Sequence, residues 1–472
     1  MADLPPSPEN NLGNVLVSAG SAAAGSSPVG SAPAGSSPVG LTPAGLIPAG
    51  IAEEILAEGG RVTFARFMEL ALTHPTEGYY CRTHEGVGWR GDFSTAPALS
   101  PDFNQALSRL VEELVDGALA AGGEDGAVTV VELGPGGGEF AEDMLAGWEV
   151  RRPDLRERVS WLLVEVGPRL REKQRRVLLR LVRTGWKVEW ADTVEAAFAA
   201  QSSLSGNQAR VVVSNEFVDA LPVHVVRVEG SSLLEAYVEV SAVPARAQAE
   251  APAWEVREVW QGLSPQAEAE LEFLFGTTDP SELLAWTRDG VLELRPAVGA
   301  LLEKAASGAS GVCMLTVDYG EAFASSLSVC RRGEGMVDEC AGGGMAGSAG
   351  VAAPLYGRTL RAFFRHQRTS DLYARVGWQD LTADVDFRAL DRHGRATGFE
   401  TILFVTVADL LRAHGAEEQL QVLVREAGKA SGRALEADRR ASILAALLDR
   451  DGLGGSFRVM LQVREGTGER GA

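Results

Sequence analysis

Cysteine is scarce in this chain, with only four among 472 residues. No two of them form a CxxC pair, and none lies with histidine at the spacing of a zinc site. The sequence therefore predicts free thiols and no bound metal. The four residues are Cys81, Cys313, Cys330 and Cys340.

Long apolar runs and an excess of positive charge are also missing. No run approaches the roughly 20 apolar residues that a membrane-spanning helix requires, so we expect no membrane insertion. The 44 Lys and Arg residues face 64 Asp and Glu residues, which gives a formal charge of −20. Such a chain offers no broad basic surface to a phosphate backbone, so we expect no nucleic-acid partner. A polymeric partner should instead be basic.

The first fifty residues have the composition of a flexible tail. Five consecutive pentads, SSPVG, SAPAG, SSPVG, LTPAG and LIPAG, place proline third and glycine fifth. This turn-rich, low-complexity pattern predicts disorder over residues 1–50. No Lys or Arg precedes Arg61, so the segment resembles neither a secretory signal nor an Arg-rich mitochondrial presequence. We therefore expect a bacterial, cytoplasmic protein.

Residues 51–124 are expected to form a helical segment that carries a lid. An amphipathic pattern begins at Ile51, and a second helix is expected from Pro101 to Ala121. The loop between them contains GDFSTAP, in which Asp92 and Thr95 are candidates to close over a ligand and touch the substrate. The alternative is an ordinary helix-joining loop with an Asx turn.

Near-continuous apolar runs then alternate with helical stretches. This alternation predicts an α/β fold with a doubly wound, mostly parallel sheet covered by helices on both faces. The expected strands are Val128 to Gly134, Trp161 to Val166, Lys187 to Asp192, Arg210 to Glu216 and Val312 to Gly320, followed by FETILFVTV and FRVMLQVRE around a helix from about Glu417 to Asp449.

This pattern divides the folded part of the chain into three further regions. Residues 125–222 form the first half of the core, and residues 223–296 are an insertion with a hairpin-like pair and a helical segment. Residues 297–472 complete the core. They include an irregular loop insertion at about 321–395, whose Gly/Ala-rich stretch from Cys340 to Ala353 is expected to be mobile.

A glycine-rich loop follows the first core strand. Gly134, Gly136 and Gly138 allow a ligand to approach the backbone closely at the start of a helix. A dinucleotide loop would need a third glycine where Glu139 stands, and no Walker-type lysine follows. An acidic residue, Glu132, two positions before a GxGxG loop instead resembles the class I methyltransferase form.

Two further carboxylates end the next strands. Glu165 stands where folds of this class bind the ribose hydroxyls, and Asp192 stands where the adenine amino group is read. Each residue taken alone is also compatible with a solvated strand end. Together they converge on one crevice at the carboxyl edge of a parallel sheet.

The fourth core strand leads into SNEFVDALPVH, which faces the reactive end of a ligand bound in that crevice. Asn215, Glu216 and Asp219 are therefore the candidates for catalysis, and His224 is a candidate for substrate contact. The alternative for Asn215 and Asp219 is helix capping before Pro222, and for His224 it is a structural hydrogen bond.

Several segments in one order resemble the MidA-like methyltransferases. The resemblance spans about Ile51 to Val463 and implies a class I, Rossmann-like fold and the cofactor S-adenosyl-L-methionine. Mitochondrial members of that family methylate arginine on a protein and assist assembly of respiratory complex I. The segments are HPTEGYY, GDFSTAP, VVELGPGGGEFAEDML, LLVEVGPRLREKQ, SNEFVDALPVH, VDYG, LRAFFRHQR and DLTADVDFRAL.

The chain departs from this pattern in several places. Gly137 and Glu139 stand where the family has GPGRGTL, and Asp384 stands where it has His. Asn104 replaces a Gly after Phe103, and Arg358 replaces a Gly before Thr-Leu-Arg. The change at Asp384 bears on any proton transfer at that position.

The resemblance implies a protein methyltransferase acting on arginine. Its guanidinium stays protonated and needs carboxylates, for which Glu216 and Asp219 are the candidates. One alternative is a small-molecule O- or N-methyltransferase with an apolar pocket from Leu233 to Trp260. Another is an assembly factor that has lost turnover. The oligomeric state stays open, with a homodimer as one expectation.

Overall fold

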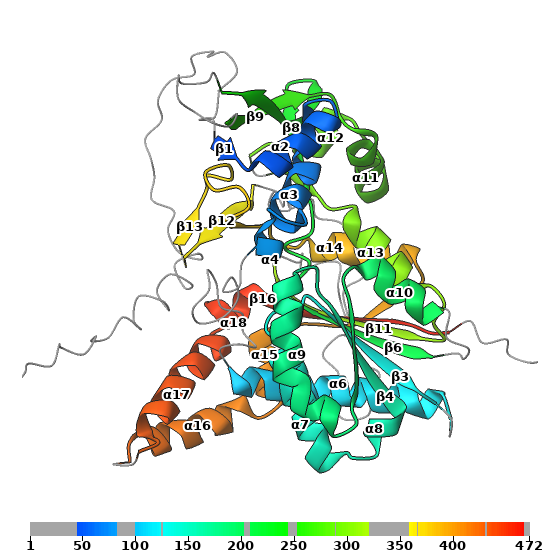
Figure 1. Ribbon diagram of the computed structural model, residues 1–472, viewed down its shortest axis with the longest axis vertical. Coiled ribbons are helices and arrows are strands. Elements are labelled where there is room, and N and C mark those ends of the chain that lie inside the picture. Colours follow the sequence, from blue (N-terminus) through cyan, green and yellow to red (C-terminus); the bar gives the residue numbers. More distant parts are fainter. Residues whose placement is uncertain are drawn as a thin grey trace, which may run out of the picture.

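The computed structural model describes residues 45–466 except 83–99, 124–125, 203–207, 244–252, 288, 321–357, 366 and 430–431. Its core is a seven-stranded sheet in the lower half of Figure 1, and a second, six-stranded sheet lies in the upper half. A small three-stranded sheet lies beside the second one, to its left in Figure 1.

The seven-stranded sheet has the order β15-β16-β11-β6-β3-β4-β5. Strands β3 to β6 and β11 pair in parallel, and β16 is antiparallel to both of its neighbours. This confirms the predicted doubly wound α/β fold of class I methyltransferases. The strands are β3 (Val128–Leu133), β4 (Val159–Val164), β5 (Lys187–Ala191), β6 (Ala209–Asn215), β11 (Val312–Tyr319), β15 (Glu400–Thr406) and β16 (Phe457–Arg464).

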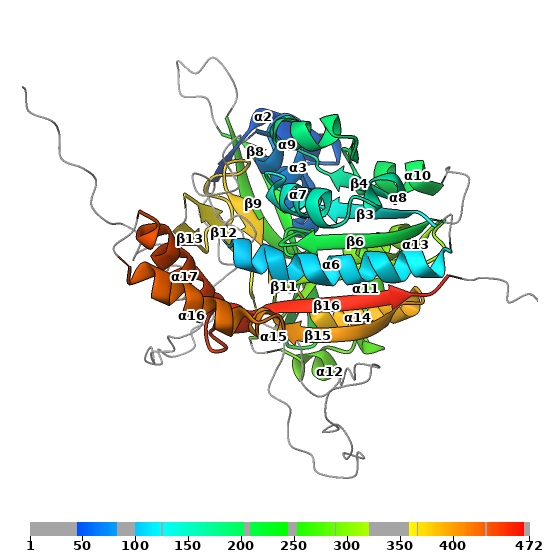
Figure 2. The ribbon, with the colours of Figure 1, turned by 90° about the horizontal axis from the view of Figure 1, so that it is seen from below.

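Helices cover both faces of this sheet, because the central strands send apolar side chains to each side. Val130 and Trp161 pack on one face, whereas Val131 and Leu162 pack on the other. Helix α6 runs along the first face in Figure 2. The first face carries α6 (Pro101–Ala121), α7 (Glu139–Arg151), α9 (Pro168–Arg183), α15 (Val407–Ala413), α16 (Ala416–Ala427) and α17 (Ala434–Leu448). The second carries α10 (Val194–Ser202), α13 (Ala297–Ala306) and α14 (Phe387–Ala396).

The six-stranded sheet is antiparallel, with the order β1-β9-β8-β7-β10, and β2 also pairs with β8. Its strands come from both the N-terminal segment and the insertion. They are β1 (Gly45–Ile47), β2 (Arg61–Thr63), β7 (His224–Glu229), β8 (Ser232–Ala242), β9 (Trp254–Gln261) and β10 (Val291–Leu294). Helices α2 (Ala49–Ala57) and α3 (Phe64–Thr73) pack on one face, and α11 (Pro265–Phe275) and α12 (Pro280–Leu284) on the other.

A three-stranded sheet and three short helices complete the described chain. The three-stranded sheet consists of β12 (Arg361–Phe364), β13 (Gln367–Thr369) and β14 (Asp380–Thr382) in the order β13-β12-β14. The short helices are α4 (Tyr79–Arg82), α8 (Leu155–Arg158) and α18 (Leu453–Ser456). Among the described helices, none combines the length and apolar character that a bilayer span requires.

Three local expectations were wrong. Residues 45–50 do not belong to a disordered tail, because β1 pairs with β9 and Ile47 is buried there. The expected helix over 417–449 is two helices, α16 and α17, which lie on either side of Gly428 and Gly432. The second half of the expected irregular loop holds β12 to β14 and most of α14. Residues 1–44 and the stretch from Cys340 to Ala353 lie outside the described residues.

Candidate active site

A cavity of about 910 Å³ lies at the carboxyl ends of β3, β4, β5 and β6. It continues against α3 and β8, so the core sheet and the six-stranded sheet share one hollow. Of the predicted site residues, Glu132, Gly134, Gly136, Glu165, Asp192, Asn215, Glu216 and His224 line it.

The glycine loop needs glycine for reasons of backbone geometry. Gly134, Gly136 and Gly138 have φ values of 62°, 53° and 88°, a region that L side chains rarely adopt. A Cβ on Gly134 would also lie 2.9 Å from Cδ2 of Phe217 in the loop after β6. Gly138 is the N-cap of α7, whose first amide groups are available to a polar ligand.

The two departures from the family pattern, Gly137 and Glu139, are linked by one ion pair. Glu139 and Lys173 form an ion pair of 3.0 Å across the loop. A Cβ on Gly137 would lie 2.1 Å from Oε1 of Glu139 and 2.3 Å from Nζ of Lys173. The glycine therefore leaves room for the ion pair.

Two buried carboxylates line the wall of the cavity. Burial raises the pKa of Glu132 to about 8, although its carboxyl accepts a 2.9 Å hydrogen bond from Nε1 of Trp161. Burial likewise raises the pKa of Glu165 to about 7, and its Oε1 accepts from the amide of Gly167 at 2.8 Å. A cationic ligand in this cavity would favour the ionised form of both groups.

Gln174 was missed as a site residue, although it lies in the quoted segment LREKQ. It is fully buried on α9, and its Nε2 donates to the carbonyl of Gly136 at 2.8 Å and to Oε2 of Glu165 at 3.4 Å. It therefore ties the glycine loop to the end of β4. Asp192, in contrast, is exposed just after β5, at the rim of the cavity.

The loop after β6 holds a strained residue at the cavity wall. Glu216 has a φ of 49°, one of two positive values outside glycine in the described chain. Such a conformation costs about 1–3 kcal/mol and is concentrated at functional sites. Nδ2 of Asn215 donates to Oε1 of Glu216 at 3.3 Å, while its buried Oδ1 has no hydrogen-bond partner among the described residues.

Asp219 is not among the described residues that line the cavity, which argues against the expected contact with a substrate. Oδ2 of Asp318 accepts from the amides of Val218 and Asp219 at 3.0 and 3.2 Å, and the carboxyl of Asp219 accepts from the hydroxyl of Tyr319. These bonds hold Asp219 inside the protein, where it is 2% exposed. Burial raises the pKa values of both aspartates.

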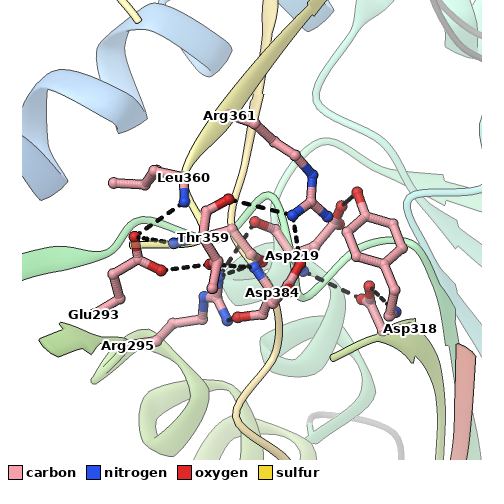
Figure 3. Close-up of polar contacts among 10 residues, drawn as sticks. Asp219, Glu293, Arg295, Asp318, Thr359, Leu360, Arg361 and Asp384 are labelled. Carbon is pink, nitrogen blue, oxygen red and sulfur yellow. Dashed lines mark hydrogen bonds and ion pairs between the residues drawn. The ribbon is translucent and has the colours of Figure 1, made fainter. Parts of the chain in front are cut away.

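A network around Asp219 fixes the loop to both neighbouring sheets (Figure 3). The buried guanidinium of Arg295 donates to the backbone carbonyls of Asp219 at 3.3 Å, Leu221 at 3.2 Å and Ala383 at 2.9 Å. Arg295 follows β10 and Ala383 follows β14. The loop that carries Glu216 therefore depends on residues from three separate parts of the chain.

Asp384, where the family has His, has a structural role. Its Oδ1 pairs with Nη1 of Arg361 at 2.5 Å, and its amide donates to Oγ1 of Thr359 at 2.9 Å. The Arg361 guanidinium lies 4.6 Å from the ring centre of Tyr319. Asp384 does not line the cavity. The presence of Asp in place of the family's His therefore affects this network and does not change a group at the cavity wall.

The other departures also have partners. Nδ2 of Asn104 donates to Oδ2 of Asp143 at 2.7 Å, and Arg358 pairs with Glu258 at 3.3 Å. Asp92 and Thr95 lie outside the described residues, so their expected lid role stays a prediction.

Comparison with known proteins identifies the family. A family model described as S-adenosyl-L-methionine-dependent methyltransferase matches residues 110–338 and 348–405, more than half of the chain. The rat protein named protein arginine methyltransferase NDUFAF7, mitochondrial, is 26% identical over 398 residues, which cover 79% of this chain and 75% of the relative. The human protein of that name is 26% identical over 401 residues, with 79% and 74% covered.

Solved structures share the fold. A superfamily member from Burkholderia thailandensis, described as a methyl transferase and bound to S-adenosyl-homocysteine, has a TM-score of 0.62 at 24% identity. A native structure of a protein from the same superfamily and organism gives 0.60 at 25%. Each covers 88% of this chain and 91% of the other.

The glycine loop with positive φ values and the carboxylates at the ends of β3 and β4 fit S-adenosylmethionine, a cation with an amino-acid part and a ribose. Glu132 and the loop would hold the amino-acid part, and Glu165 the ribose hydroxyls. The cytoplasmic location stays a prediction, since the named relatives are mitochondrial. The chain belongs to this family and is an S-adenosylmethionine-dependent methyltransferase.

Proposed function

We propose that this methyltransferase acts on arginine in a basic protein partner, with Glu216 binding the acceptor guanidinium. The proposal is supported by relatives named protein arginine methyltransferase that cover most of the chain. It is also supported by the formal charge of −20, which favours a basic partner.

The acidic wall of the cavity is the observation that carries the proposal. Among the described residues, eight acidic side chains and only three basic ones line it. The basic ones are already paired or bonded to acidic or amide groups, as with Arg66, which donates to Glu58 and Glu69 at 2.9 Å each. The eight are Glu58, Glu69, Glu132, Glu139, Glu165, Asp192, Glu195 and Glu216, and the three are Arg61, Arg66 and Lys304.

This surplus suits a reaction with two cationic partners. The cofactor carries a sulfonium, and an arginine guanidinium stays protonated at neutral pH. Glu132 and Glu165 stand at the cofactor end, whereas Asn215 ends β6 and Glu216 follows it. A carboxylate such as that of Glu216 can accept two guanidinium N–H groups and orient one nitrogen. Asp219 supports this loop and does not touch the acceptor.

The test is methylation by the full-length protein. We expect purified wild type with isotope-labelled S-adenosylmethionine to form methylated arginine in a basic polypeptide, detected by mass spectrometry. Glu216→Gln should lower kcat by about 100-fold or more, because it removes the charge that orients the acceptor. The affinity for S-adenosylhomocysteine, measured by calorimetry, should change less than about twofold.

The matched control is Glu272→Gln on α11, which removes an exposed carboxylate away from the cavity. It should leave both quantities unchanged. Undiminished turnover of Glu216→Gln would refute the role of that residue. Label found only in a small molecule would favour the O- or N-methyltransferase alternative, and cofactor binding without any transfer would favour an assembly factor.

A further inference from the structure

His224, which lines the cavity, forms a buried pair with Glu235. His224 opens β7, and Glu235 lies on the neighbouring strand β8. Nδ1 of His224 lies 2.6 Å from Oε1 of Glu235, and both side chains are more than nine-tenths buried. His224 nevertheless lines the cavity. The hydrogen bond therefore fixes Nδ1 of a ring that belongs to the cavity wall.

The hydrogen bonds of Glu235 determine which ring nitrogen carries the proton. Its second oxygen, Oε2, accepts from the backbone amide of Ser264 at 2.6 Å, and an amide can only donate. A fully buried carboxyl with two donors is best satisfied as a carboxylate. It then accepts from Nδ1–H of His224, and in the neutral ring this leaves the lone pair of Nε2 available. Nε2 has no hydrogen-bond partner in the described part of the chain.

The other ionisable groups around this hollow are less suited to accept a proton. Arg66 of α3 is bound to Glu58 and Glu69, and Arg61 is a cation. Glu216 is assigned to the guanidinium, and Glu132 and Glu165 lie at the cofactor end. The ionisable groups that line the cavity from the end of α2, from β2, α3 and β8 and from the loop after β6 are Glu58, Arg61, Arg66, Glu69, Tyr237 and Glu216.

We propose that Nε2 of His224 accepts the proton that the acceptor arginine loses, and that Glu235 holds the ring in the tautomer this requires. The inference rests on the proposed function. A bond forms between the guanidinium nitrogen and the methyl carbon, and the carbon–sulfur bond breaks with its electron pair left on sulfur. The guanidinium nitrogen loses one proton, which goes to Nε2. The product arginine keeps its positive charge, and the imidazolium is stabilised by the carboxylate of Glu235.

Two substitutions separate the base from the residue that positions it. His224→Asn keeps a donor for Glu235 but removes Nε2. Glu235→Gln keeps the size of the side chain. Because the amide of Ser264 must face an oxygen, the Gln amino group would face Nδ1 and donate to it. The ring would then carry its proton on Nε2, the wrong tautomer for a base.

The experiment compares these variants with His393→Asn. His393 and Glu270 form a second buried pair, 2.8 Å apart, which does not line the cavity. For His224→Asn we expect kcat for arginine methylation to fall by about 100-fold or more, with KM and the affinity for S-adenosylhomocysteine changed less than about threefold. The decline of log kcat on the acid side should disappear in this variant. His393→Asn should keep both kcat and the pH profile.

A second measurement does not depend on the acceptor. Nitrogen-15 NMR of the His224 ring, in protein loaded with S-adenosylhomocysteine, should show Nδ1–H and a bare Nε2, and Glu235→Gln should reverse this. An Nε2–H ring in the wild type would overturn the inference, as would wild-type kcat and pH profile in His224→Asn. In both cases the proposed function could stand. A wild type that methylates no arginine would overturn the proposed function, and with it the transfer of a guanidinium proton to His224.

Discussion

The seven-stranded sheet and the six-stranded sheet meet at one cavity but contribute to it in different ways. The core sheet offers backbone geometry, in the positive φ values of Gly134, Gly136 and Gly138, and buried carboxylates at the ends of its strands. The six-stranded sheet and α3 offer side chains, among them His224 and Arg66. We infer that changes at the glycine loop and the ends of β3 and β4 alter cofactor affinity, whereas changes in the loop after β6 and around the second sheet alter turnover.

The largest effect should come from the glycine loop. Gly134→Val places a branched side chain at a φ of 62° and against Phe217, so the loop must move. Backbone strain of about 3 kcal/mol corresponds to roughly 100-fold in affinity. Calorimetric titration with S-adenosylhomocysteine should show this loss. Gly276→Val is the matched control, because its φ is 71° and no atom lies within 4 Å of an added Cβ. Equal affinities of the two variants would contradict the comparison.

The pH dependence of stability should reveal the buried Glu132. The pKa of Glu132 is about 8 in the folded protein and 4.5 ordinarily. Between these two pH values the folded state holds a proton that the unfolded chain has released. Stability should therefore fall as pH rises, by up to about 1.4 kcal/mol per pH unit from this group. Urea unfolding of Glu132→Gln at several pH values should give a shallower slope. Identical slopes would show that Glu132 is ionised in the folded protein.

A smaller effect on stability should appear where the two sheets meet, at Glu216. Glu216→Gly removes the carboxylate and relieves the strain of a φ of 49°. We expect the free energy of unfolding to rise by about 1 kcal/mol while methyl transfer is lost. Denaturant unfolding checks the first part and the methylation assay the second. A less stable variant would mean that contacts of the Glu216 side chain outweigh the backbone strain.

The smallest effect should follow from Asp384→Asn. The Arg361–Asp384 pair is about one-third exposed on the aspartate side, so its loss should cost about 1 kcal/mol or less. Thermal unfolding should show a small decrease in Tm, with cofactor affinity and turnover close to wild type. A large loss of turnover at normal stability would assign Asp384 a direct part in the reaction.

The core sheet was largely predictable, because each central strand is an apolar run that ends in a glycine or a polar residue. The glycine loop, Glu165 and the loop after β6 could be placed for the same reason, since carboxyl ends of parallel strands share one edge. Of the six-stranded sheet, only the hairpin-like pair of the insertion, β7 and β8, was predicted. The sheet joins Gly45–Ile47 and Arg61–Thr63 to strands about 210 and 180 residues later, respectively, and three-residue strands leave no periodic signal.

The buried contacts within the site could not be predicted from the sequence pattern either. Asp219 looked like a catalytic acid by position, but the amides of its own loop bind Asp318, about a hundred residues away, and Asp219 lies inside the protein as a result. Gln174 and Glu235 are ordinary polar residues on a helix and a strand. Their importance comes from partners that only the tertiary fold brings near, Gly136 and His224.

The most direct test of the account is the pair of measurements on Glu216→Gln, made on one preparation beside the wild type. We predict methylated arginine from the wild type, a loss of about 100-fold or more in the variant, and equal calorimetric affinity of both for S-adenosylhomocysteine. Equal turnover, or a variant that fails to bind the cofactor, would contradict the division between a core that holds the cofactor and a loop that orients the acceptor.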